Sequence, residues 1–259
     1  MSMIATTFPL SPCASRPLPT ADADSRTFGF WATLAWFGAA AVTYHVVTML
    51  CGIGYAAWSA FNYPSAAIDW DSPTADYIAT ALSVMAAASV LMYAAWRGGP
   101  SAFAYLGLTR PSMRHVFVGL GLLVALAFVN AGFFRLFPAY NPSPDLIREY
   151  QAILGNPAAL VWFWITLAVT APICEEIIFR GFLMRGWSES RIGASGAIML
   201  SSLLFTAIHV QYNLPTLATV FGLSLVFGVM RWRSGSTTLT ILLHMVWNLS
   251  VGLTTISLA

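Results

Sequence analysis

Residues 158–179 read AALVWFWITLAVTAPICEEIIF, an apolar run that carries no charge before Glu175. A run of about 20 apolar residues is long enough to cross the hydrocarbon core of a bilayer as an α-helix. Similar runs recur along the chain, at 28–56, 77–96, 115–137, 196–212, 214–230 and 237–257. The pattern predicts an all-α fold: a polytopic transmembrane helical bundle of about seven spans, within a range of six to eight.

The composition excludes the other broad classes of protein. Only 8% of the 259 residues are charged and 58% are apolar, whereas a soluble domain carries about 25% charged residues. An aromatic content of 14% and a mean hydropathy of +0.72 exclude a disordered chain. The continuous apolar runs lack the alternation of a membrane β-barrel. The three cysteines are far apart in the sequence, so they encode no disulfide framework or zinc knuckle.

Arginine positions predict the orientation in the membrane, because positive charge concentrates in cytoplasmic loops. With these spans, two arginines fall outside, Arg135 and Arg148, and ten fall on the side of the amino terminus: Arg16, Arg26, Arg97, Arg110, Arg114, Arg180, Arg185, Arg191, Arg231 and Arg233. We therefore expect the N-terminus inside and the C-terminus outside, with residues 1–26 as a flexible cytoplasmic tail. Residues 143–154 predict a short interfacial helix on the outer side.

Two adjacent glutamates near the end of the 158–179 span are the strongest chemical signal, because ionisable residues are costly inside a bilayer. Glu176 and Arg180 are four residues apart, on one face of a helix and in the favourable order for an ion pair. Such a pair is explained by a position at the cytoplasmic interface. Glu175 points about 100° away from Glu176, so it has no charge partner on its own helix and is the candidate general base.

Two later spans carry polar residues at helical spacing. His209 follows Phe205 by one turn, and Asn248 follows His244 by one turn. Each of these polar residues alone is more often an interhelical hydrogen bond than a catalyst. Together with Glu175 they form a set that can polarise a water and hold an oxyanion. A glutamate and two histidines are also a zinc-ligand set, although the usual His-Glu-x-x-His helix is absent.

The predicted spans place Glu175, His244 and His209 at different depths in the membrane. At 1.5 Å per residue, Glu175 and His244 are expected roughly 10 Å from the inner face, and His209 roughly 20 Å from it. Either the helix that carries His209 enters the membrane late and tilted, or the site is a deep cavity open to the cytoplasm.

In order and spacing, three motifs resemble those of the CPBP family, the CAAX protease and bacteriocin-processing family of intramembrane endopeptidases, also labelled the abortive-infection family. The motifs are Glu-Glu-x-x-x-Arg at 175–180, Phe-x-x-x-His at 205–209 and His-x-x-x-Asn at 244–248. The resemblance implies a catalytic membrane domain at 155–259, preceded at 27–154 by accessory spans and the interfacial helix.

The resemblance also implies roles for the motif residues. Glu175 and His209 would activate the water. His244 and Asn248 would stabilise the oxyanion. Glu176 and Arg180 would support the site. Because one glutamate is committed to Arg180, we expect a glutamate-type protease that needs no cofactor. The alternative is a divalent metal such as zinc, held by Glu175, His209 and His244.

The function implied is an intramembrane endopeptidase that cleaves a peptide bond near the inner membrane face through a water activated by glutamate and histidine. Its expected partners are membrane lipid and a peptide or membrane-protein substrate, with no nucleic acid, and its expected location is the bacterial cytoplasmic membrane. The alternative from another class is a non-enzymatic bacteriocin-immunity or scaffold protein that binds a partner in the same cavity. A small transporter is disfavoured because no inverted repeat is apparent.

Overall fold

The computed structural model describes residues 28–99, 101–140 and 150–258. Within these ranges every regular element is helical, which confirms the all-α prediction. The single helices are α1 (Phe30–Asn62), α2 (Pro73–Gly98), α3 (Ala102–Leu106), α4 (Met113–Leu136), η1 (Pro138–Tyr140), α9 (Gly193–Ala207), α10 (Leu214–Ser234) and α11 (Thr237–Leu258). The predicted tail at 1–26 lies outside the described residues, as does most of the predicted interfacial helix, of which residues 150–154 are described and helical.

One continuous helical path runs from Pro157 to Ser188. It consists of α6 (Pro157–Trp164), the π-helical segment η2 (Ile165–Thr170), α7 (Ala171–Glu176), the π-helical segment η3 (Ile177–Leu183) and α8 (Met184–Ser188). The predicted end of this span at 179 is therefore corrected. The helix continues because the side chains of Arg180 and Arg185 are buried beside acidic partners one turn away and do not face the interface.

Six helices are long and apolar enough to cross a membrane, so the chain is an integral membrane protein with six candidate spans in its described part: α1, α2, α4, the path from α6 to α8, α10 and α11. The span predicted at 196–212 is not among these six helices. Its helix, α9, has 15 residues and ends at Ala207, a length of about 22 Å against a hydrocarbon core of about 30 Å. The chain then turns, and Asn213 caps α10 by accepting a hydrogen bond from the N–H of Thr216.

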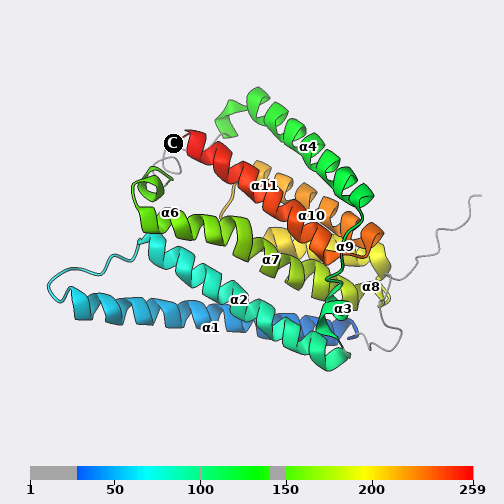
Figure 1. Ribbon diagram of the computed structural model, residues 1–259, viewed down its shortest axis with the longest axis horizontal. Helices are drawn as coiled ribbons and strands as arrows, with labels where there is room; N and C mark the ends of the chain where they lie inside the picture. The colour runs from blue at the N-terminus through cyan, green and yellow to red at the C-terminus, as the bar shows by residue number, and fades with distance from the viewer. Residues whose placement is uncertain (1–27, 100, 141–149, 259) are drawn as a thin grey trace, which may run out of the picture.

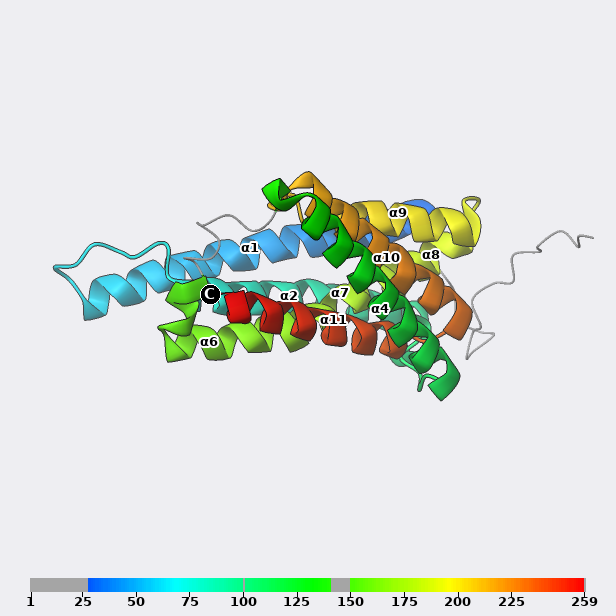
Figure 2. The same ribbon diagram turned by 90° about the horizontal axis from the view of Figure 1, so that it is seen from above.

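The path from α6 to α8 runs beside α2 through the middle of the bundle (Figure 1). α1 packs along α2 on one side, and α11, α10 and α4 follow on the other. Seen from above, α9 lies beside α10 (Figure 2). Small and large side chains from the two central helices share the main apolar cluster, among them Leu91, Ala94, Ala95, Phe179, Phe182 and Leu183. The alanines allow close approach of the helices.

The end of the bundle that the arginines assign to the cytoplasm is closed by contacts between α3 and the turn from α10 to α11. The N–H of Thr237 donates to the carbonyl of Gly107 over 2.7 Å. Gly107 has a φ of +68°, and a Cβ there would meet the guanidinium of Arg231. Arg231 was assigned to a cytoplasmic loop, and this assignment is corrected: the side chain is buried in α10, where its Nε donates to the carbonyl of Arg180 over 3.2 Å.

Candidate active site

The two glutamates lie in α7, a short α-helical segment between two π-helical ones. Pro172 is in the first turn of α7, and a proline cannot supply an N–H to the turn before it. The wider π register of η2 accommodates this gap in the same helical path. π-Helical segments are frequent at functional sites. In each of the two segments a carbonyl accepts a hydrogen bond from a side chain of another helix: Leu167 from Asn248 and Arg180 from Arg231.

Glu176 lies at the centre of a buried polar cluster. Its Oε1 accepts a hydrogen bond from Nη1 of Arg180 and another from Nδ1 of His244, each at 3.0 Å. The ion pair predicted from the i,i+4 spacing is therefore present. It is not a feature of the interface, however, because both side chains are 0% exposed. A pair removed from water in this way depends on further hydrogen bonds for its stability.

Arg180 obtains those further contacts from α10 and from aromatic rings. Its Nη2 donates to Oγ of Ser224 at 2.6 Å and to the carbonyl of Ser224 at 3.1 Å. Its guanidinium carbon lies 4.6 Å from the ring centre of Phe205 and 5.4 Å from that of Phe227. Aromatic faces attract a cation electrostatically, so hydroxyl, carbonyl and ring contacts together replace the water that the guanidinium has lost.

His244 lies between the two glutamates. Its Nδ1 is 3.0 Å from Oε1 of Glu176, and its Nε2 is 3.8 Å from Oε2 of Glu175. Because a carboxylate can only accept, Nδ1 carries a proton, and in the neutral ring Nε2 is then an acceptor. Nε2 and Oε2 are two acceptors beside each other, and one water molecule can donate a hydrogen bond to each. The side chain of Glu175 is 16% exposed, so Glu175 is the glutamate that water reaches.

His209 lies in the turn after α9. Its Nδ1 is 2.7 Å from the carbonyl oxygen of Phe205, so Nδ1 carries a proton and Nε2 is an acceptor in the neutral ring. The ring centre of Phe205 is 4.8 Å from that of His209 and 5.9 Å from that of His244. Phe205 thus contacts both imidazoles. Among the described contacts, His209 makes no hydrogen bond or ion pair with Glu175.

The longer central helix changes the depths expected from the sequence. Glu175 precedes Ser188, the end of that helix, by about 20 Å of helical rise. His209 lies just beyond Ala207, the end of α9, which follows Gly193, its start, by about 21 Å. Both residues are therefore far from the same end of the bundle, and the depth difference expected between them largely disappears.

The structure brings four of the six predicted site residues into one connected cluster: Glu175, Glu176, Arg180 and His244. His209 reaches this cluster through the ring of Phe205. Asn248 lies one turn beyond His244, and its Nδ2 donates to the carbonyl of Leu167 at 2.9 Å.

Ser224 and Phe227 also contact Arg180, and the sequence analysis did not predict either of them as a site residue. Ser224 is the only one of the two with a usable signal, because a hydroxyl in an apolar membrane helix often bonds to another helix. No group of three His, Cys, Asp or Glu side chains among the described residues is arranged to hold a metal ion.

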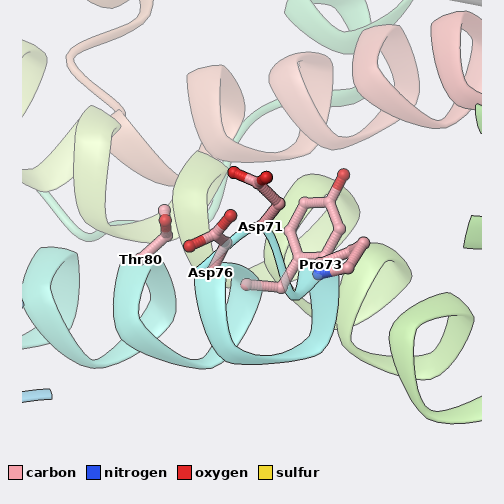
Figure 3. A pocket seen from close by; sticks show the side chains of 5 residues that line it. Asp71, Pro73, Asp76 and Thr80 are labelled. Carbon is pink, nitrogen blue, oxygen red and sulfur yellow. The ribbon is translucent and has the colours of Figure 1, made fainter. Parts of the chain in front are cut away.

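A separate pocket of about 340 Å³ lies near the start of α2 (Figure 3). Its lining residues are Asp71, Pro73, Asp76, Tyr77 and Thr80. Asp71 and Asp76 contribute two carboxylates to this lining (Figure 3). None of the six predicted site residues lines this pocket.

The comparison with protein families supports the resemblance seen in the motifs. Residues 157–250 match the family model described as type II CAAX prenyl endopeptidase Rce1-like. This segment is therefore similar to the Rce1-like members of the CPBP family. The matched segment includes all six residues of the three motifs and the whole buried cluster.

Two relatives of the chain are bacterial. An "Uncharacterized 24.3 kDa protein" of Escherichia coli is 37% identical over 133 residues, which cover 49% of this chain and 60% of the relative. The UPF0177 protein YbdI of Lactococcus lactis subsp. lactis (strain IL1403) is 34% identical over 99 residues, 35% of this chain and 52% of the relative. The chain thus spans little more than half the length of these relatives. No solved structure matches it significantly.

Proposed function

We propose that the protein is an intramembrane endopeptidase that hydrolyses a peptide bond with a water held by Glu175 and His244. The observation that carries the proposal is the position of His244 between two different glutamates. Glu176 is buried, paired with Arg180 and bound to Nδ1. Glu175 is partly exposed and faces Nε2. Glu176 orients the imidazole, and Glu175 is placed to act as the general base on the water.

The proposed reaction begins when the carboxylate of Glu175 takes a proton from the water. The water oxygen bonds to the carbonyl carbon of the substrate, and negative charge develops on the carbonyl oxygen. The C–N bond then breaks, and Glu175 returns the proton to the leaving amine. His209, whose Nε2 is an acceptor in the neutral ring, is the second residue proposed for water activation.

Two residues are proposed to stabilise the oxyanion. The amide of Asn248 has two N–H groups and uses one on the carbonyl of Leu167, so the other can donate to the oxyanion. Nε2 of His244 first accepts a hydrogen bond from the water, and it can donate to the oxyanion after it takes up the second proton of that water. Preorganised donors of this kind supply a large share of catalysis in acyl transfer.

The proposed mechanism is of the glutamate type and uses no metal. Glu176 is supported in a structural role by its two contacts at Oε1, which commit it to Arg180 and His244. The alternative, a divalent ion such as zinc on Glu175, His209 and His244, would require His209 to turn its Nε2 toward Glu175. The two mechanisms differ in their response to chelators.

The proposed substrates are peptides or membrane proteins that reach the site through lipid, with no role for nucleic acid. The family description names a prenyl endopeptidase, so lipid-modified peptides are the first class to test. The two relatives are bacterial, which supports a location in the bacterial cytoplasmic membrane.

The test is cleavage of quenched fluorogenic peptides, with and without a prenylated cysteine, by the full chain in detergent and in liposomes. Wild-type protein is expected to cleave, and Glu175→Gln is expected not to. Asp69→Asn is the matched control, since it converts an exposed carboxylate far along the sequence from the site to an amide. Cleavage that persists in Glu175→Gln would refute the proposal. Peptide binding without cleavage in the wild type would favour the immunity or scaffold alternative.

A further inference from the structure

Ser224 occupies a completely buried position in the apolar stretch GLSLVFG at 222–228 of α10. Both of its oxygens face the same guanidinium. Its Oγ accepts from Nη2 of Arg180 at 2.6 Å and its carbonyl accepts from the same nitrogen at 3.1 Å. In a membrane helix, a buried hydroxyl gains stability only from a polar partner. Arg180 is the partner of Ser224.

The contacts of Ser224 continue through the protein to the imidazole of His244. Arg180 donates from Nη1 to Oε1 of Glu176, and the same oxygen accepts from Nδ1 of His244. Three consecutive contacts therefore join α10 to α11 through the central helix. All four side chains are at most 4% exposed, so bulk water does not reach the contacts between them.

The orientation of the Arg180 guanidinium depends on few directional contacts. Within the described residues its Nε has no hydrogen-bond partner. The rings of Phe205 and Phe227 attract its charge but do not fix its rotation in the plane. Ser224 on Nη2 and Glu176 on Nη1 are the two groups that do so.

We propose that Ser224 is a positioning residue for His244, acting through Arg180 and Glu176. This inference rests on the proposed function, in which Nε2 of His244 flanks the hydrolytic water. Loss of the Ser224 hydroxyl removes the shorter of the two contacts on Nη2, so the guanidinium turns toward the remaining carbonyl. The turn displaces Nη1, then the shared Oε1 of Glu176, and finally the ring of His244. A displacement of about 1 Å at a reacting group can reduce turnover by up to about a hundredfold.

The first experiment reads the position of His244 without requiring activity. The chain contains only four histidines, so ring-labelled histidine gives a simple NMR spectrum of the full chain in detergent micelles. Ser224→Ala is expected to shift the signals of His244 and to leave those of His45 and His115 in place. The signals are assigned by their disappearance in the four single His→Gln variants.

The control is Ser201→Ala, which removes the same atom from a buried position of α9. The hydroxyl of Ser201 donates to the carbonyl of Ile198 on its own helix, so all four histidine signals are expected to stay unchanged. Ser224→Cys keeps the side-chain volume and serves if Ser224→Ala does not fold. An unchanged His244 signal in a folded Ser224 variant would overturn the inference.

The second experiment measures cleavage kinetics on the fluorogenic peptide. Ser224→Ala is expected to lower kcat by about tenfold and to leave KM unchanged, because it removes no contact with substrate. In an Arg180→Lys background the same change is expected to cost nothing further, since Ser224 acts only through the guanidinium. An equal loss in both backgrounds would contradict the relay. Activity that survives in Glu175→Gln would instead refute the proposed function, and the NMR result would still stand as the test of the Ser224 relay.

Discussion

Nδ1 of His244 lies 3.0 Å from Oε1 of Glu176, although the two residues are 68 positions apart in the chain. The same oxygen accepts a hydrogen bond from Arg180. This one buried atom therefore joins α11 to the central helix and also pairs with the positive charge of Arg180. Glu176 is thereby bound to the fold, and Glu175, its neighbour in sequence, is left to face the open side of His244. The two glutamates should consequently respond differently to the same substitution.

Glu175→Gln should reduce turnover by about two to four orders of magnitude, the usual contribution of a general base. The protein should keep its melting temperature, because the amide is neutral and has nearly the same shape. The measurements are peptide cleavage and thermal unfolding in detergent on the same preparation. A fall in melting temperature as large as the one expected for Glu176→Gln would argue against this role.

Glu176→Gln should lower stability together with activity. It leaves the guanidinium of Arg180 buried without its carboxylate, and breaking a buried pair at one end costs roughly 3–5 kcal/mol. The double variant with Arg180→Gln should recover much of the melting temperature, because no unpaired charge remains. Arg180→Gln should not restore activity to Glu175→Gln. If Glu176→Gln melts like the wild type, the pair is not a stabilising element.

Gly107→Ala should destabilise the protein more than Gly193→Ala. Both glycines have a positive φ, +68° and +61°, which costs an alanine about 1–2 kcal/mol. At Gly193 the added Cβ meets nothing within 4 Å, whereas at Gly107 it meets the guanidinium of Arg231. The difference between the two melting temperatures therefore measures the displacement of Arg231. Equal melting temperatures would mean that this guanidinium moves aside freely.

Strong chelators should leave peptide cleavage unchanged if the enzyme is of the glutamate type. The check is activity after dialysis against chelator, followed by addition of zinc. Loss of activity on chelation with recovery on zinc would replace the proposed mechanism by the metal-dependent one. Asp69→Asn would then serve as the comparison, since an exposed carboxylate outside the ligand set should not change the zinc requirement.

Reporter fusions should place residues near 105, 188 and 234 in the cytoplasm and residue 70 and the C-terminus outside. The first three positions lie toward one end of the bundle, where Thr237 bonds to Gly107, and the C-terminus lies at the other end (Figure 1). An outside C-terminus requires that the short α9 also crosses the membrane, as the seventh span. A cytoplasmic C-terminus would show that the chain crosses the membrane an even number of times.

Several features of the fold and site were predictable because they depend on neighbours in the chain. Apolar runs of sufficient length identify membrane helices whatever packs around them, and six of the seven predicted spans are helices of that length. The pair of Glu176 and Arg180 follows from the i,i+4 geometry of any α-helix. The motif spacing predicted the resemblance to the CPBP family, and the matching family model covers residues 157–250, which contain all three motifs.

Other features depended on groups from distant parts of the chain. The central helix continues to Ser188 because Arg180 finds Glu176, Ser224 and Phe205 inside the protein, and the sequence alone places such an arginine at the interface. Local geometry separates Glu175 from Glu176, but it does not show that His244 will lie between them. That arrangement was decided by helix packing in a medium without water, where a buried charge is stable only beside partners that the folded chain brings to it.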